Sequence, residues 1–352
     1  MFFKEILEKI IERKHLSEEE AYNLMTKVME GEFTQNQISA IIASLRCKGE
    51  TADEITGFAK AMRDKCERIY PNVNDFIDTC GTGGDGSNTF NISTAAAIIA
   101  SSCGVAVAKH GNRSVSSKCG SADVLEALGV DITLEPFQVK ECIEKTGIGF
   151  MFAPLFHKSM RNAAQPRKEL GIRTIFNFLG PLTNPANALF QLLGIFSPRY
   201  LDLFAEVLAK LGIKRAMIVS GDCGMDEIAT TGITFVAEVC EGRINRYQIH
   251  PSDFGIKVAD IRMIKGGDAS YNAEVIRGVF EGKRGPYFDI AVLNAAAALY
   301  ICGKCEDIRE GILICTDSID KGYALEKLNL FASYTQKASQ RNEEVLICNH
   351  LK

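Results

Sequence analysis

The 352-residue sequence has no tryptophan, no apolar run of about 18 residues, and no basic run with interleaved aromatic side chains. Without such an apolar run, no segment is expected to cross a bilayer as a helix, so we predict no membrane partner. Because tryptophan and a basic run with interleaved aromatic side chains are both missing, nucleic-acid binding has little support. The opening segment, MFFKEILEKIIERK, mixes charges with apolar residues where a signal peptide would have an unbroken hydrophobic block. We therefore expect a cytoplasmic protein.

Cysteine is frequent, but the twelve cysteines are mostly scattered singly through the chain. In a long chain this distribution indicates reduced, mostly buried thiols and not a disulfide framework. Cys302 and Cys305 are close in sequence, but they lack the second ligand pair of a zinc site, so we interpret them as packing residues. The length suggests two domains, and the 46% hydrophobic content can supply a large core.

The first organisational unit spans residues 2–68, where a Ser or Thr is followed three places later by Glu or Gln on three occasions. These capping boxes predict helix starts, and Gly31 and Gly49 stand where the preceding helices should stop. Four short helices are expected, with apolar stripes at Ile6 to Ile11 and at Ile38 to Leu45. Because such stripes must pack against something, the unit is interpreted as a structural or dimerising helical domain.

From about Phe76 the pattern changes to short apolar runs that alternate with helical segments, including DFIDTC, VAVAKH, RAMIVS and ITFVAEVC. This alternation is typical of an α/β fold.

A glycine-rich stretch, DTCGTGGDGSNTFNIST at residues 78–94, combines small hydroxyl and amide side chains and contains no lysine or arginine. We expect a strand up to Cys80, a glycine turn from Gly81 to Gly86, and a helix that begins near Ser93 or Thr94. Such a turn presents bare amides and a helix N-terminus to an anion. The stretch therefore predicts a phosphate-binding loop.

Two common nucleotide-binding motifs fit this stretch poorly. Three of its glycines satisfy G-x-G-x-x-G, but a dinucleotide site wants an acidic residue about 20 positions later. This chain offers Lys109 and His110 there, which disfavours NAD, although the basic pair could suit NADP. A P-loop is excluded because Gly86 is followed by Ser-Asn where Lys-Ser/Thr is required.

A second candidate anion loop, KHGNRSVSSKCGSADVLEALG at residues 109–129, lies between an expected strand and an expected helix. Its basic and hydroxyl residues include Lys109, Arg113, Lys118, Ser116, Ser117 and Ser121. Two such loops at the carboxyl ends of neighbouring strands suggest a ligand with phosphate at both ends. Asp226 and Glu227 follow the strand RAMIVS, and adjacent carboxylates beside phosphates indicate Mg²⁺.

Four motifs occur together in the order of one enzyme family: GTGGDGSNTFNIST at 81–94, KHGNR at 109–113, MRNAAQPRKELGIRTIFNFLGPLTNPA at 160–186, and MDE at 225–227. Along nearly all of its length the chain resembles the anthranilate phosphoribosyltransferases. The resemblance implies an α/β protein of the nucleoside-phosphorylase-like phosphoribosyltransferase fold. A small N-terminal α-helical domain (1–70, with part of about 167–190 packing onto it) would join a larger α/β domain (71–352) with a central, mostly parallel sheet. The active site would lie in the cleft between the domains, and a homodimer would form through the helical domain.

The implied reaction is Mg²⁺-dependent transfer of the phosphoribosyl group from 5-phosphoribosyl 1-pyrophosphate (PRPP) to the amine of anthranilate, the second step of tryptophan biosynthesis from chorismate. Carried over residue by residue, PRPP binding falls to Gly81, Gly84, Asp85, Thr89, Asn91, Ile92, Ser93, Thr94, Lys109, Ser117 and Ser121. Mg²⁺, expected as two ions per chain, falls to Ser93, Asp226 and Glu227. Anthranilate falls to Gly81, His110, Asn112 and Arg167. Lys109, His110, Asn112 and Arg167 are expected to position the substrates, and no residue is assigned as a certain acid or base.

One residue departs from the family pattern, because Cys119 stands where Ser is common and a thiol is the weaker donor. No glutamine-amidotransferase segment precedes the helical unit, so we expect the chain to carry the transferase step alone. Two alternatives stay open: a pyrimidine-nucleoside phosphorylase, and a non-catalytic relative of the same fold that binds nucleic acid. The first has no need of an Asp-Glu metal pair. The second fits poorly with Arg167, the Asp226-Glu227 pair and a pI near 5.9.

Overall fold

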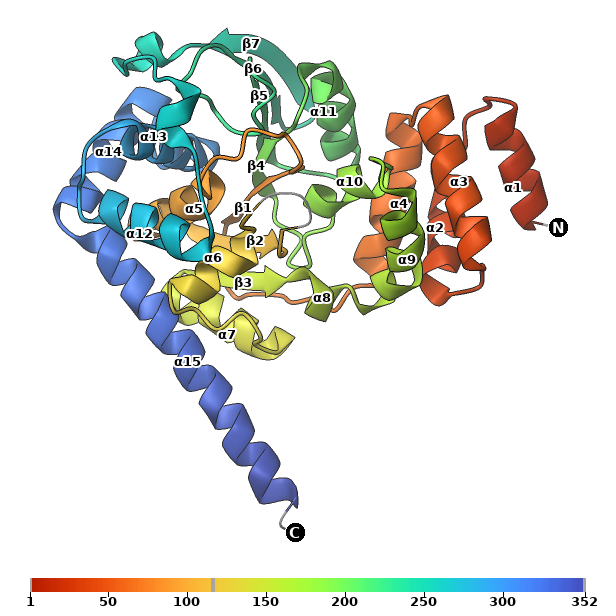
Figure 1. Cartoon of the computed structure of the whole chain (residues 1–352), viewed down its shortest axis with the longest axis horizontal. Coiled ribbons are helices and arrows are strands. Elements are labelled where there is room, and N and C mark those ends of the chain that lie inside the picture. The colour runs from red at the N-terminus through yellow and green to blue at the C-terminus, as the bar shows by residue number, and fades with distance from the viewer. Residues whose placement is uncertain (1, 115–117, 351–352) are drawn as a thin grey trace.

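The computed structural model describes residues 2–114 and 118–350. A bundle of helices lies beside a larger α/β body, and the last helix projects away from that body (Figure 1). The bundle is built from the first four helices: α1 (Phe2–Ile11), α2 (Glu18–Glu30), α3 (Gln35–Lys48) and α4 (Ala52–Asp64).

The predicted capping boxes start three of these helices. In each box the Ser or Thr side chain accepts a hydrogen bond from the backbone three residues on, while the Glu or Gln there accepts one in return; the pairs are Ser17 with Glu20, Thr34 with Gln37, and Thr51 with Glu54. Gly31 ends α2 in the left-handed conformation, at φ 76°. These local hydrogen bonds satisfy backbone groups that a helix end leaves without partners, which is why the sequence signals are reliable here.

Most apolar side chains of the two stripes pack inside the chain itself. Ile6, Ile10, Ile38 and Leu45 are buried in one core, whereas Ile11 remains 63% exposed. Most of the two stripes is therefore buried within the chain, and Ile11 is a member that stays available for a dimer contact.

Two later helices complete this core. The helix α9 (Arg161–Leu170) packs on α2 and α3, and α10 (Phe176–Leu179) packs on α4. The segment that packs on the bundle thus includes α9, and the turn Lys158–Met160 before it also contacts α2.

A seven-stranded sheet forms the centre of the body, in the order β3-β2-β1-β4-β5-β6-β7. The first five strands in that order are parallel, and β6 and β7 are antiparallel additions. The strand bounds are β1 (Phe76–Gly81), β2 (Ala106–Gly111), β3 (Ile148–Phe152), β4 (Phe190–Gly194), β5 (Arg215–Gly221), β6 (Thr234–Cys240) and β7 (Arg243–Ile249).

Helices cover the sheet, and alternate side chains of its strands enter separate cores. The remaining helices are α5 (Ile92–Ser102), α6 (Ser121–Ala127), α7 (Pro136–Thr146), α8 (Ala153–Phe156), α11 (Leu201–Lys210), α12 (Ala269–Phe280), α13 (Pro286–Ile301), α14 (Ile308–Asp320) and α15 (Tyr323–His350). Leu192 of β4 faces the core that contains α5 and α13, while its neighbour Leu193 faces the core of α11 and the bundle.

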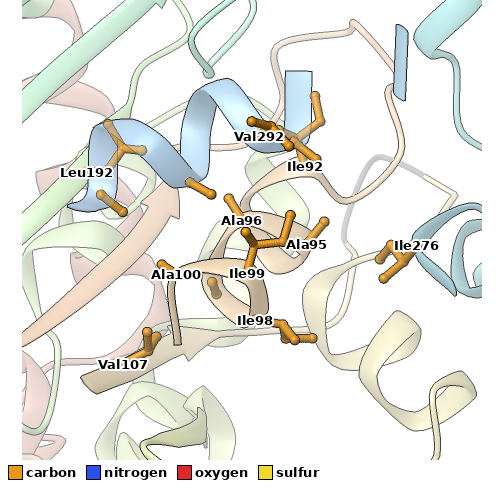
Figure 2. Close-up of a cluster of buried hydrophobic side chains, with 14 of the residues drawn as sticks. Ile92, Ala95, Ala96, Ile98, Ile99, Ala100, Val107, Leu192, Ile276 and Val292 are labelled. Atoms are coloured by element: carbon orange, nitrogen blue, oxygen red, sulfur yellow. The ribbon is translucent and has the colours of Figure 1, made fainter. Parts of the chain in front are cut away.

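The helix α5 lies at the centre of the larger core. Figure 2 shows its alanine and isoleucine side chains enclosed by Val107 of β2, Leu192 of β4, Ile276 of α12 and Val292 of α13. Because the N-terminus of α5 directly follows the glycine-rich stretch, this packing fixes one wall of the candidate site. No helix in the described ranges is both long and apolar enough to span a bilayer.

Candidate active site

Three loops meet at one edge of the sheet because β2, β1, β4 and β5 are parallel neighbours whose carboxyl ends lie on the same side. The glycine loop (residues 82–91) follows β1 and leads into α5. The second loop, of which residues 112–114 and 118–120 are described, lies between β2 and α6 in the sequence. The acid loop (residues 222–233) follows β5 and carries Asp226 and Glu227.

The glycine loop turns through three glycines in the left-handed region: Gly83 and Gly84 at φ 66° and Gly86 at φ 75°. All three are exposed, and a Cβ at Gly83 or Gly86 would meet nothing within 4 Å. The loop therefore presents bare backbone to open space, as the sequence predicted for an anion site.

Gly81, predicted to contact both substrates, also has a packing role that the sequence did not suggest. A Cβ at Gly81 would lie 2.3 Å from Asp226 Oδ2, and one at its strand partner Gly194 would lie 1.5 Å from the Asp226 carbonyl oxygen. The missing side chains admit the acid loop, so Gly81 makes room for Asp226.

The acid loop is bonded to the glycine loop and to the start of α5. The Gly83 amide donates to Asp226 Oδ2 at 2.7 Å, and the Ser93 amide donates to Glu227 Oε1 at 3.1 Å. Asp85 contributes a third carboxylate, whose Oδ2 is buried without a hydrogen-bond partner.

The crowding of these acids changes their protonation. Burial and then the charge of Asp85 raise the pKa of Asp226 to about 7, and burial and then Asp226 raise the pKa of Glu227. A divalent cation would relieve this repulsion, and carboxylate and hydroxyl oxygens are ligands that Mg²⁺ accepts. Within residues 2–114 and 118–350 no group of three or more His, Cys, Asp and Glu side chains is arranged to hold a metal ion. A metal here needs further oxygens from Ser93, water or a phosphate.

Lys109 lies beneath the glycine loop and is not exposed. Its side chain, from a residue with 3% exposure, donates to the Thr79 carbonyl and to Ser93 Oγ, the latter at 3.3 Å. Burial lowers the pKa of Lys109, and the neighbouring Asp78 opposes that shift. The cation is therefore held against Ser93, one of the predicted metal ligands.

Other predicted residues of the glycine loop shape it from within. Ile92 and Thr94 are 1% exposed, so their side chains face the core. Thr89 forms a single β-bridge with Lys265. Asn91 uses its amide side chain on Cys119 and Asn272.

The second loop is closed by Asp123, which accepts from the Ser114 and Gly120 amides at 3.1 and 2.8 Å. Arg113, predicted to attract an anion, is instead paired with Asp123 and with Glu126. Its charge is therefore turned toward α6.

Two further members of the second loop have clear places. Ser121 is partly buried, and its hydroxyl donates to the Asn112 carbonyl at 3.3 Å. The Cys119 thiol donates to the Gly120 carbonyl at 3.5 Å, and the residue is 7% exposed. This thiol is thus turned inward. The predicted Ser117 lies outside the described residues.

Two buried histidine rings lie 5.0 Å apart, His110 in β2 and His157 after α8. The Nε2 atom of each is buried without a hydrogen-bond partner. Burial lowers the pKa of His157 to about 4 and, with His157, lowers that of His110 well below its usual value. Both rings are therefore neutral at physiological pH.

Two arginines come from α9 and the segment after it. Arg167 of α9 lies over the Phe176 ring at 5.1 Å and forms no ion pair with any described residue. Arg173 stacks on Phe196 at 4.0 Å and donates to the Gly84 carbonyl, which bonds the segment after α9 to the glycine loop. Asn112 is exposed, and its Oδ1 accepts from the Arg113 amide at 2.7 Å.

Sequence reasoning missed several residues that the fold brings to this edge: Asp78, His157, Arg173, Lys265 and Asn272. The sequence does contain a signal near Lys265 and Asn272, since a Gly-Gly pair and the helix cap Asp268 lie between them. This signal predicts the start of a helix, but it does not show which loop that helix contacts.

Comparison with known proteins finds similarity along almost the whole chain. The helical bundle domain of a glycosyl transferase family matches residues 4–66, and the a/b domain of a glycosyl transferase family matches residues 73–325. The anthranilate phosphoribosyltransferase of Acetivibrio thermocellus is 56% identical over 97% of this chain and 99% of its own length. The anthranilate phosphoribosyltransferase of a Thermoanaerobacter species is 52% identical over 95% of this chain and 99% of its own length.

Solved structures agree with these matches. The anthranilate phosphoribosyltransferase from Thermus thermophilus has a TM-score of 0.90 at 41% identity, with 94% of this chain and 99% of that chain covered. The enzyme from Saccharomyces cerevisiae in complex with PRPP and Mg has a TM-score of 0.88 at 27% identity, with 95% and 98% covered. The same yeast enzyme in complex with 4-fluoroanthranilate gives 0.86 at 26% identity, with the same coverage.

Proposed function

This chain belongs to the anthranilate phosphoribosyltransferase family, and on that premise we propose how its residues share the work of the reaction. It transfers the phosphoribosyl group of PRPP to the amine of anthranilate, a step of tryptophan biosynthesis that yields N-(5-phosphoribosyl)anthranilate and pyrophosphate. Neither alternative considered from the sequence, a nucleoside phosphorylase or a nucleic-acid-binding relative, has a specific observation in its favour. The observation that carries the proposal is the bond between the Gly83 amide and Asp226, which joins a phosphate loop to a metal-type acid pair.

PRPP is assigned to the glycine loop and the second loop. The backbone at Gly83 and Gly86 faces open space, and the loop amides other than that of Gly83, which is bonded to Asp226, suit phosphate oxygens. The N-terminus of α5 adds the favourable end of its dipole. Ser117 and Ser121 remain proposed contacts for the second phosphate group.

Mg²⁺ is assigned to Ser93, Asp226 and Glu227, with two ions per chain. The support is the buried, mutually repelling carboxylates, together with the unpartnered Oδ2 of Asp85. Bound Mg²⁺ would offset the negative charge that develops on the pyrophosphate leaving group. The ammonium group of Lys109 donates a hydrogen bond to the Ser93 hydroxyl and so helps to position it.

Anthranilate is assigned to Arg167, Asn112, Gly81 and the two histidines. The Arg167 guanidinium has no carboxylate partner among the described residues, and its fork matches the carboxylate of anthranilate. The neutral rings of His110 and His157 supply a wall with unpartnered nitrogens.

The chemistry asks for positioning more than for a strong base. The C1–O bond of PRPP breaks, the anthranilate nitrogen bonds to C1, and the resulting ammonium loses its proton. The amine attacks as a neutral group, so orientation supplies much of the rate enhancement. The low pKa of each histidine makes it a weak proton acceptor, which favours a role as a wall.

We also propose a cytoplasmic location, because the cysteines whose side chains are described are free thiols, as is usual in a reducing compartment. Recovery of the native protein in a membrane or secreted fraction would contradict this location.

The assigned activity is tested by the loss of anthranilate fluorescence in the presence of PRPP and Mg²⁺. We expect Asp226→Asn with Glu227→Gln to lower turnover by at least about 100-fold, because charge stabilisation of the leaving group contributes several kcal/mol. The matched control is Asp202→Asn with Glu206→Gln, the same charge change on exposed residues of α11. Normal, Mg²⁺-dependent activity in the first double variant would remove these acids from the site, and an inactive wild type would refute the function.

The two substrates should respond to different residues. Arg167→Ala should raise the anthranilate KM roughly tenfold to 100-fold and leave the PRPP KM near its wild-type value, because a charged hydrogen bond contributes about 1.5–3 kcal/mol. Gly83→Val should do the reverse, because a side chain at φ 66° displaces the loop. Steady-state kinetics in each substrate, with Lys168→Ala as the exposed α9 control, would refute this division if Arg167→Ala raised both constants alike.

We propose a homodimer formed through α1, because Ile11 is 63% exposed and Phe2 and Phe3 are partly exposed on the same helix. Light scattering of the wild type at micromolar concentration should give twice the chain mass. Ile11→Asp should shift the protein toward the monomer, whereas Leu313→Asp, at a 70% exposed site on α14, should not. A fully active wild-type monomer would contradict the proposal.

A further inference from the structure

Asn272 is a buried amide that contacts the site from a distant part of the sequence. It lies in the first turn of α12 and is 1% exposed. Its Oδ1 accepts from the Gly267 amide at 2.8 Å, and its Nδ2 donates to Asn91 Oδ1 at 2.9 Å. Sequence reasoning assigned it no role, and no assigned substrate contact includes it.

The hydrogen bonds continue from Asn91 into the second loop. Asn91 Nδ2 donates to the Cys119 carbonyl at 3.2 Å, while the Asn91 backbone carbonyl accepts from the first turn of α5. The chain of bonds therefore runs from α12 through the end of the glycine loop to the residue before Gly120. It ties together the two loops to which PRPP is assigned.

The donor and acceptor roles in this series of hydrogen bonds are fixed by chemistry. A backbone amide can only donate, so Gly267 requires the oxygen of Asn272 and leaves its NH₂ group for Asn91. Asn91 must then present its own oxygen to Asn272, which leaves its NH₂ group for the Cys119 carbonyl. Each bond determines the next, so a change at Asn272 alters the preferred orientation of Asn91.

A strap of backbone supports the same region. Residues 264–267, just before α12, run beside the glycine loop: the Gly266 amide donates to the Asn88 carbonyl at 2.8 Å, and the Phe90 amide donates to the Ile264 carbonyl at 3.3 Å. Lys265 adds a bond from its ammonium group to the Ser87 carbonyl. Asn272 bonds both to this strap, at Gly267, and to the loop, at Asn91.

We propose that Asn272 is a positioning residue for PRPP, which holds the glycine loop and the second loop at the spacing that the two phosphate ends require. It touches neither substrate and acts through Asn91. This inference rests on the proposed assignment of PRPP to the two loops.

The test is steady-state kinetics of Asn272→Ala in both substrates. The PRPP KM should rise roughly tenfold, because a buried hydrogen bond to each of two partners is lost. The anthranilate KM should stay within about twofold, and the exposed Asn245→Ala on β7 should behave as wild type. A purely structural role would lower the melting temperature without this split between substrates.

A double-mutant cycle tests the route of action. If Asn272 acts through Asn91, the variant with Asn91→Ala and Asn272→Ala should have the PRPP KM of Asn91→Ala alone, and additive effects would overturn the proposal. Asn272→Asp keeps an acceptor for Gly267 but removes the donor to Asn91, so it serves if Asn272→Ala does not fold. A PRPP KM within twofold of wild type in Asn272→Asp and Asn91→Ala would refute the inference. An inactive wild type would instead refute the proposed function.

Discussion

The site depends on one close approach between the acid loop and the ends of two parallel strands. Gly81 of β1 and Gly194 of β4 are register partners, and Asp226 lies over both at distances that leave no room for a Cβ atom. This packing places the Asp226 carboxylate within hydrogen-bond distance of the Gly83 amide. Without it, the acid pair that follows β5 would lie away from the glycine loop that follows β1.

The same packing accounts for the charges of the site. Three carboxylates, Asp85, Asp226 and Glu227, gather where burial raises the pKa of the latter two, and the nearest buried cation, Lys109, is held beneath Ser93. Such a cluster is unfavourable in the free protein, since like charges repel and lose hydration. We infer that the fold tolerates this unfavourable electrostatic free energy because bound metal and pyrophosphate offset it. The cores around α5 and the bundle supply the rigidity that keeps the acids together.

The sequence predicted what depends on local chemistry. Capping boxes indicated the starts of α2, α3 and α4, and the stretch from Asp78 to Thr94 was correctly expected to run from strand through glycine turn to helix. The packing role of Gly81 could not be predicted from the sequence, because a glycine that makes room for Asp226 looks the same in sequence as one that faces a ligand. Asn272 and Arg173 were missed for a related reason, since their partners Asn91 and Gly84 lie far away in the chain.

The central claim is that Gly81 is required in order to place Asp226 at the metal site. It is tested most directly by the Mg²⁺ dependence of turnover in Gly81→Ala, whose Cβ would lie 2.3 Å from Asp226 Oδ2. The control is Gly104→Ala, at the other end of α5, where φ 86° strains the backbone of an alanine but its Cβ meets nothing within 4 Å. The account predicts that Gly81→Ala needs at least roughly tenfold more Mg²⁺ for half-maximal rate, since loss of a metal ligand's geometry costs about 1.4 kcal/mol or more, while the control keeps the wild-type Mg²⁺ requirement. A wild-type Mg²⁺ requirement in folded Gly81→Ala would contradict it.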